Sequence, residues 1–308
     1  MKLSVVATLY QSEPYITEFH QRATSVAKQL VGDEYEIVLV NDGSPDNSLD
    51  LAVQLTMGDS HVVVVDLSRN FGHHKAMMTG LAHAKGEQVF LIDSDLEEDP
   101  KCLITFAEKM HGDRCDVVYG VQEHRKGGWF ERWSGQWFWL LFNVVTGLGL
   151  PANTATVRLM SRRYVDALLC HDEREVFITG LWHITGFDQR SQIIEKSYRQ
   201  NSTYTLRSKI SLFVNAITSF SNAPLISIFY IGVSIFIVAG LYTGYLMFYW
   251  LFLDKPASGW TSVMASIWVL GGLIISLIGV VGIYLSKIFS ETKRRPYVIV
   301  RQIYEKHK

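Results

Sequence analysis

Residues 91–100, LIDSDLEEDP, decide the fold class, because they join a short apolar run to a run of acids. Side chains alternate along a strand, so a strand that enters this segment directs Asp93 and Asp95 to the same side. Two convergent carboxylates repel each other unless a cation lies between them, and hard oxygen ligands favour Mg²⁺ or Mn²⁺. The segment therefore predicts either a cation site at the end of a strand or a solvated acidic turn before a helix near Pro100.

The sequence around this segment alternates short runs rich in valine and isoleucine with helix-like stretches. The short runs, predicted as strands, are residues 3–7, 36–40, 62–67, 88–92 and 116–119. The helix-like stretches are residues 15–30, 48–56, 74–84 and 101–109. This alternation predicts an α/β domain over residues 1–209, with a mostly parallel sheet and helices on its faces. Ligands of such sheets bind beyond the carboxyl ends of the strands, where the polar motifs lie.

Two further polar motifs follow predicted strands. In residues 40–46, VNDGSPD, a turn leaves Asp42 at the end of a strand. Asp42 could accept hydrogen bonds from a base or a ribose, or form a turn that only caps the next helix. Residues 67–81 form a polar, glycine-containing turn that leads into a helix, so its amides and Lys75 can face phosphates. His73 and His74 are interpreted as polar residues at the helix start rather than as ligands.

The second part of the chain predicts a membrane protein. Of the 308 residues, 48% are hydrophobic and only 19% are charged, and two long runs, residues 210–253 and 256–286, contain no charge. Each run is long enough to cross a hydrocarbon core of ~30 Å, which predicts transmembrane helices at residues 225–253 and 262–286 rather than buried core helices. The positive charges lie outside the two spans, so a multi-pass protein with both termini in the cytoplasm is expected.

Charge and cysteine content exclude several other classes. The tail, residues 287–308, has seven basic and two acidic residues, although the chain as a whole has a net charge of −1. A basic tail beside apolar segments indicates a membrane surface and not nucleic acid. The three cysteines fit neither a disulfide framework nor a zinc site. Only a short apolar run follows the first two residues, so no signal peptide is predicted and the first domain is expected in the cytoplasm.

The three polar motifs, in this order and spacing, resemble those of the family 2 glycosyltransferases, which have the Rossmann-like GT-A fold. The closer resemblance is to the polyprenyl-phosphate glycosyltransferases of that family, and it includes the two C-terminal spans. It implies that Asp42 binds the base and that Asp93 and Asp95 are the catalytic residues. It further implies that Asp93 contacts ribose and phosphate, and that Asp95 and Glu97, with Asp93, hold Mg²⁺ or Mn²⁺. By the same resemblance, the nucleotide-sugar site also includes Thr8, Tyr10, Glu13, Val40, Lys75 and Ser94.

The acceptor side is expected in an aromatic segment, residues 128–150. Its tryptophans recur four residues apart, which predicts one face of a helix, either a core helix or an amphipathic helix at the bilayer surface. Residues 210–223 predict a second amphipathic helix before the first span. Arginine offers bidentate contacts to phosphate, and Arg125 and Arg158 are the expected ligands of the acceptor phosphate. Thr156 stands where the family commonly has an aspartate.

The resemblance implies inverting transfer of one sugar from a nucleotide diphosphate, with UDP-hexose as the expected donor, to polyprenyl (undecaprenyl) phosphate. The reaction would take place at the inner face of the bacterial cytoplasmic membrane and serve cell-surface polysaccharide or O-antigen modification. A homotetramer and a flippase partner are also expected. Two alternatives remain, a processive polysaccharide synthase and a non-catalytic membrane subunit that binds nucleotide sugars.

Overall fold

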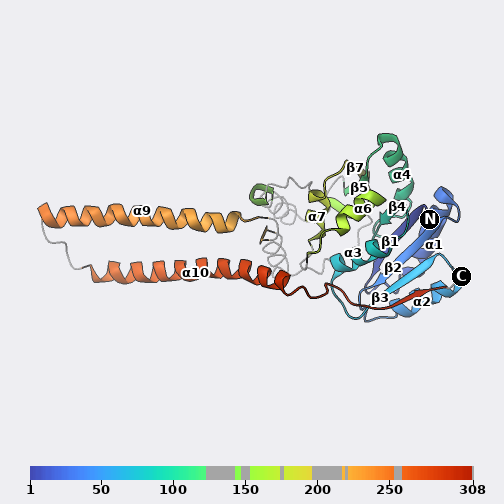
Figure 1. The fold of residues 1–308 in the computed structure, drawn as a ribbon, viewed down its shortest axis with the longest axis horizontal. Coiled ribbons are helices and arrows are strands. Elements are labelled where there is room, and N and C mark those ends of the chain that lie inside the picture. Colours follow the sequence, from blue (N-terminus) through green and yellow to red (C-terminus); the bar gives the residue numbers. More distant parts are fainter. Residues whose placement is uncertain are drawn as a thin grey trace. The chain divides into compact units, whose positions relative to one another are not determined.

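The computed structural model describes residues 1–122, 143–146, 153–173, 177–195, 217–218, 221–252 and 259–306. Its central feature is an eight-stranded sheet with the order β7-β5-β6-β4-β1-β2-β3-β8 (Figure 1). The strands are β1 Leu3–Leu9, β2 Tyr35–Asn41, β3 Val62–Leu67, β4 Gln88–Leu91, β5 Val117–Gln122, β6 Thr154–Ser161, β7 Gln189–Ile194 and β8 Val300–Glu305. The helices are α1 Ile16–Val31, α2 Ser48–Gly58, α3 His73–His83, α4 Cys102–Asp113, α6 Arg162–Leu169, α7 Ile178–Ile184, α9 Ala223–Phe252 and α10 Trp260–Thr292.

The mostly parallel sheet that the sequence predicts is confirmed. Strands β1, β2, β3 and β4 pair in parallel, and so do β5 and β7. The sheet is mixed because β6 runs antiparallel to β4 and β5, and β8 runs antiparallel to β3. Strands β6, β7 and β8 were not predicted from the sequence, since their residues lack a long apolar run.

Helices cover both faces of the central strands, which explains why β1 and β2 are buried at every position. Val5 belongs to the apolar core that the sheet shares with α1, α2 and α4. Its neighbour Val6 points to the opposite face, where Gly80 of α3 packs so closely that a Cβ atom would overlap the Val6 side chain. Successive side chains point to opposite faces of the sheet and are buried on both, which holds the carboxyl ends of these strands in one layer.

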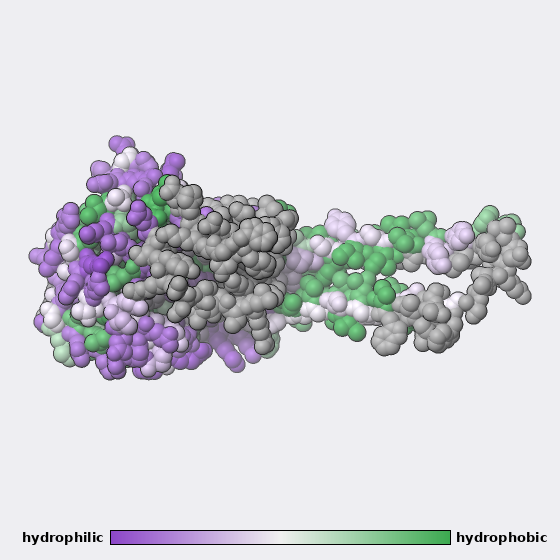
Figure 2. All heavy atoms as spheres, turned by 180° about the vertical axis from the view of Figure 1, so that it is seen from behind, coloured by the Kyte–Doolittle hydropathy of each residue, from purple (hydrophilic) through white to green (hydrophobic). Residues whose placement is uncertain are grey.

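The helices α9 and α10 run alongside each other, and their described side chains are largely apolar (Figures 1 and 2). Large apolar side chains are exposed along both, for example Phe229, Leu241 and Ile275. Within the described residues, one segment, Val269–Thr292, is long and apolar enough to cross a membrane, and the apolar segment recognised in α9, Ala223–Ile235, is shorter. The second predicted span is therefore not confirmed by this criterion.

The described chain divides into two compact units. The first comprises residues 1–143, 148–205 and 295–308, and the second comprises residues 144–147 and 206–294. The C-terminal tail, predicted only as a basic segment, thus returns to the sheet as β8. Several expectations fall outside the described residues: Arg125, the helix over residues 128–150 apart from a helical stretch at 143–146, and most of the helix over residues 210–223.

Candidate active site

The acidic motif directly follows β4 and forms a tight turn beside β1. Ser94 is buried, and its hydroxyl donates a hydrogen bond of 2.8 Å to the carbonyl oxygen of Thr8. The carboxylate of Asp95 accepts a hydrogen bond of 2.9 Å from the backbone amide of Glu97. Ser94 therefore ties the turn to β1, while Asp93 and Asp95 flank it on the partly exposed side.

His73, the first residue of α3, connects this turn to the end of β1. Its Nδ1 lies 3.1 Å from the hydroxyl of Thr8, and its Nε2 lies 3.3 Å from Oδ1 of Asp93. Although 47% of the side chain is exposed, burial of the ring lowers the pKa of His73, and the charges of Asp42 and Asp95 oppose this effect. From the sequence, His73 was predicted only as a polar residue at the helix start. Its position at the helix that follows β3, at the carboxyl edge of the sheet, was the available signal.

The acids of this turn fit a divalent cation that also binds a substrate phosphate. Within the residues that the structure describes, no three side chains from histidine, cysteine, aspartate or glutamate are grouped as a ready ligand set. A Mg²⁺ ion commonly uses only one or two protein carboxylates, with water and phosphate oxygens as its other ligands. Asp93 and Asp95 can supply such a pair. One oxygen of Asp95 already accepts the Glu97 amide, which limits how it could bind a cation.

Asp42 holds the loop that connects β3 to α3. Its carboxylate is buried and accepts hydrogen bonds from the backbone amides of Phe71 at 2.7 Å and Gly72 at 3.0 Å. Burial raises the pKa of Asp42, although these two hydrogen bonds act in the opposite direction. The start of α2 is instead satisfied by Asp46, which accepts the amide of Ser48 at 3.1 Å. The hydrogen bonds of Asp42 thus go to the loop before α3, and Asp46 is the residue that accepts the amide of the first residue of α2.

The other expected donor residues lie around the same strand ends. Glu13 accepts hydrogen bonds of 3.2 Å from the backbone and side-chain amides of Asn47, so it joins the loops after β1 and β2. Tyr10 is half-exposed, whereas Val40 is fully buried and packs against α3. Lys75 lies in the first turn of α3. Thus Glu13 joins two loops and Val40 packs β2 against α3, whereas Tyr10 and Lys75 are partly exposed at the strand ends.

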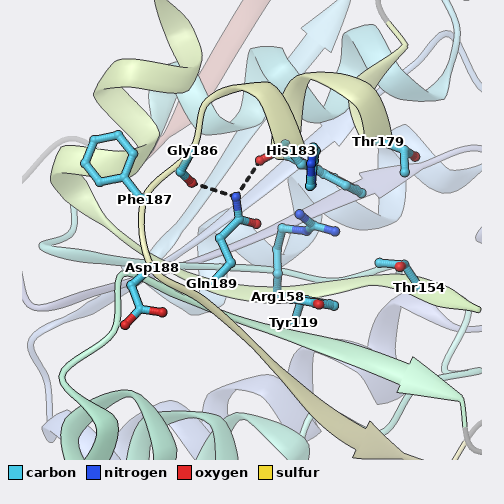
Figure 3. A pocket seen from close by; sticks show the side chains of 10 residues that line it. Tyr119, Thr154, Arg158, Thr179, His183, Gly186, Phe187, Asp188 and Gln189 are labelled. Carbon is cyan, nitrogen blue, oxygen red and sulfur yellow. Dashed lines mark hydrogen bonds between the residues drawn. The ribbon is translucent and has the colours of Figure 1, made fainter. Parts of the chain in front are cut away.

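Arg158 lies in β6, opposite Leu91 of β4, and lines a cavity of about 600 Å³ next to α7 (Figure 3). Its guanidinium lies over the ring of Trp182, 2.9 Å from the ring centroid, and Nε donates a hydrogen bond of 3.2 Å to the carbonyl oxygen of Thr156. Only 1% of Arg158 is exposed, and burial lowers its pKa to about 9. A direct contact with an acceptor phosphate would require Trp182 to move.

Known proteins resemble this chain along its length. Residues 4–169 match glycosyl transferase family 2. A protein of Mycobacterium tuberculosis (strain CDC 1551 / Oshkosh) that is named a glycosyltransferase is 50% identical over 99% of this chain and 89% of its own length. The bactoprenol glucosyl transferase of Shigella phage SfV is 30% identical over 98% of both chains.

Among solved structures, glucosyl-3-phosphoglycerate synthase from Mycobacterium tuberculosis aligns with a TM-score of 0.49 and 17% identity, over 70% of this chain and 78% of that chain. The sequence match covers more than half of the chain, and the relatives cover nearly all of it. The chain therefore belongs to glycosyl transferase family 2 and is a glycosyltransferase.

Proposed function

We propose that this glycosyltransferase moves one sugar, with inversion, from a nucleotide diphosphate to a polyprenyl phosphate at the cytoplasmic face of a bacterial membrane. The observation that carries the proposal is the match to a bactoprenol glucosyl transferase over 98% of both chains, which includes the C-terminal helices as well as the sheet. A glucosyl relative favours UDP-glucose as the first donor to test. The exposed apolar side chains of α9 and α10 support a lipid environment for the second unit.

The return of the chain to the sheet supports two membrane crossings. Helices α9 and α10 lie between β7 and β8 in the sequence, and both strands belong to the same sheet. A single crossing would place β8 on the opposite side of the membrane from β3, with which it pairs. With 30 and 33 residues, both helices exceed the ~20 residues that span a bilayer. The basic residues 293–295 after α10 favour the cytoplasm for the sheet and the tail.

The proposed chemistry needs little from the protein beyond positioning and charge. An oxygen of the acceptor phosphate forms a bond to the anomeric carbon, while the bond from that carbon to the diphosphate breaks and the nucleotide diphosphate leaves. Because the acceptor is already anionic near neutral pH, no strong base is required, which suits a threonine at position 156. Asp93 and Asp95 would hold Mg²⁺ or Mn²⁺, which when bound would neutralise charge on the leaving diphosphate. His73 keeps Asp93 oriented toward the end of β1.

The test uses membranes that contain the wild-type chain, Asp95→Ala, or the control Asp99→Ala, which removes a more exposed charge from the same acidic run. They are incubated with undecaprenyl phosphate, Mg²⁺ or Mn²⁺, and radiolabelled UDP-glucose or other nucleotide sugars. We expect label in a chloroform-soluble, mild-acid-labile lipid for the wild type and Asp99→Ala, and none for Asp95→Ala.

Other outcomes would replace the proposal. Water-soluble polymer as the labelled product would indicate a processive synthase. No labelled product with any donor, despite measurable nucleotide-sugar binding, would indicate a non-catalytic subunit.

A further inference from the structure

The strand that follows the helical pair reaches the loop beside Asp42. β8 pairs with β3 from Val63 opposite Glu305 to Leu67 opposite Val300. Beyond the paired residues, the amide of Ser68 donates a hydrogen bond of 2.9 Å to the carbonyl oxygen of Ile299. The tail is thus attached along β3 up to the point where the loop over residues 68–72 begins.

One side chain of β8, Arg301, makes two contacts at this point. Its guanidinium donates a hydrogen bond of 2.7 Å to the carbonyl oxygen of Ser68. It also lies 3.3 Å from Oδ2 of Asp66, whose side chain is only 1% exposed. A carboxylate buried to this extent needs a cation or several donors to remain charged. Arg301 therefore provides the charge partner of Asp66 and holds the first residue of the loop.

Asp66 carries this contact on to the neighbouring strand. Its Oδ1 accepts a hydrogen bond of 2.8 Å from the side-chain amide of Asn41, which is buried at the end of β2. The side-chain oxygen of Asn41 in turn accepts the backbone amide of Ser44 at 3.3 Å. Arg301, Asp66 and Asn41 thus form a chain of contacts beneath the two loops that follow β2 and β3.

These two loops are in close contact above that chain. Asp42 binds two amides of the second loop, as described above, and Gly43 lies so near it that a Cβ atom would be 2.5 Å from the backbone of Arg69 and Asn70. A shift at the base of either loop would therefore move both.

We propose that Arg301 is a positioning residue for the nucleotide sugar, and that it links the segment following α10 to the donor site through Asp66 and Asn41. This inference rests on the proposed function, because it places the donor at Asp42 and the adjacent loops. The C-terminal tail, which follows α9 and α10, would thus also contribute to donor binding.

The experiment compares Arg301→Ala and Arg301→Lys with Lys306→Ala in the full chain, purified in detergent. Lys306 is a matched control because it directly follows the same strand and its replacement also removes one positive charge. Its ammonium group donates a hydrogen bond of 3.1 Å to the carbonyl oxygen of Met57, away from both loops. The donor is UDP-glucose, or the nucleotide sugar that the screen above identifies.

We expect Arg301→Ala to raise the KM for the donor about tenfold, while kcat and the KM for undecaprenyl phosphate change less than about threefold. Arg301→Lys should recover part of the donor KM because it keeps the charge. Lys306→Ala should match the wild type. Equal donor KM values for Arg301→Ala and Lys306→Ala would overturn the inference.

Two further measurements keep the inference testable. If Arg301→Ala does not fold, the double variant with Asp66→Asn removes the unpaired buried charge. Its donor KM should still exceed that of Asp66→Asn alone, because the direct hydrogen bond from Arg301 to the carbonyl oxygen of Ser68 is lost as well. Hydrogen exchange of residues 41–48 and 67–76 needs no turnover, and we expect it to be faster in Arg301→Ala than in Lys306→Ala. Equal exchange in the two variants would refute the positioning role. If the wild type transfers no sugar but Arg301→Ala still exchanges faster than Lys306→Ala, only the proposed function is refuted.

Discussion

Replacing Asp42 by alanine separates a loop-holding role from a purely base-binding role. The carboxylate accepts hydrogen bonds from two backbone amides of the loop between β3 and α3. The donors, Phe71 and Gly72, follow Asp42 by 29 and 30 positions in the sequence. In Asp42→Ala both amides lose their partner in a partly buried location. We therefore expect the loop to move and the protein to lose stability, in addition to any loss of donor binding.

The magnitude follows from the two bonds. A hydrogen bond to a charged group contributes about 1.5–3 kcal/mol. Burial raises the pKa of Asp42, so desolvation of the carboxylate offsets part of this gain. A net loss of about 2–4 kcal/mol is expected for Asp42→Ala. For a domain of this size, such a loss of stability corresponds to a decrease in apparent Tm of about 5–15 °C. Asp42→Asn keeps one acceptor oxygen and should lie between the wild type and Asp42→Ala.

The assay is thermal unfolding of the full chain in one detergent, with UDP-glucose binding measured on the same samples. Asp33→Ala is the control, since Asp33 is an exposed acid in the loop before β2. We expect the apparent Tm to fall in the order Asp33→Ala, Asp42→Asn, Asp42→Ala. A variant Asp42→Ala that keeps the Tm of Asp33→Ala and loses only donor affinity would refute the loop-holding role.

Three further predictions concern single sites. Gly43 has φ of +60°, and a Cβ atom would meet the backbone of residues 69–70 at 2.5 Å, so Gly43→Ala should weaken UDP-glucose binding and lower the apparent Tm, unlike Gly58→Ala, whose Cβ meets nothing. If Asp93 binds the metal as proposed, His73→Ala should reduce kcat about 10–100-fold without a comparable change in Tm, because His73 orients that carboxylate. An unchanged kcat would contradict this role of His73. Burial acts to raise the pKa of Asp116, but the hydrogen bonds that its carboxylate accepts from Arg163 and Ser161 outweigh the effect of burial. The pKa of Asp116 is therefore lowered below 3.8. Its stabilising contribution is therefore full above about pH 3.8 and lost as the pH falls through the lower folded pKa, so urea unfolding of Asp116→Asn should show lower stability at pH 7 and a smaller loss on acidification.

The sequence was sufficient to predict the central sheet, because its strands are short apolar runs separated by helix-length segments. It also placed Asp93 and Asp95 at the end of β4, since the period of a strand and the position of the turn determine this. It could not predict β8, whose residues 300–305 contain two charges and are mostly exposed. The pairing of β8 with β3 depends on a tertiary contact more than 200 residues apart in the chain, which no local pattern encodes.

Side-chain roles at the site were harder to predict than the positions of those residues. The sequence placed Asp42 at the end of a strand, but its partners lie in a loop that folding brings near. His73 was overlooked for the same reason, because its contacts with Thr8 and Asp93 join three separate segments. Local sequence indicates which residues emerge at the edge of the sheet, whereas only the packed structure shows which of them contact one another.

Arg158 illustrates how burial changes the interpretation of a charged residue. A phosphate ligand needs an accessible cation, yet Trp182 covers this guanidinium and backbone carbonyls of β6 accept its hydrogen bonds. Burial lowers the pKa of Arg158, and the described groups that oppose this effect are the tyrosines Tyr164 and Tyr119 rather than carboxylates. In this arrangement the guanidinium packs α7 against the sheet through the ring of Trp182. Binding of the acceptor phosphate by Arg158 remains a prediction, and it requires a second arrangement of Trp182 in which the guanidinium is uncovered.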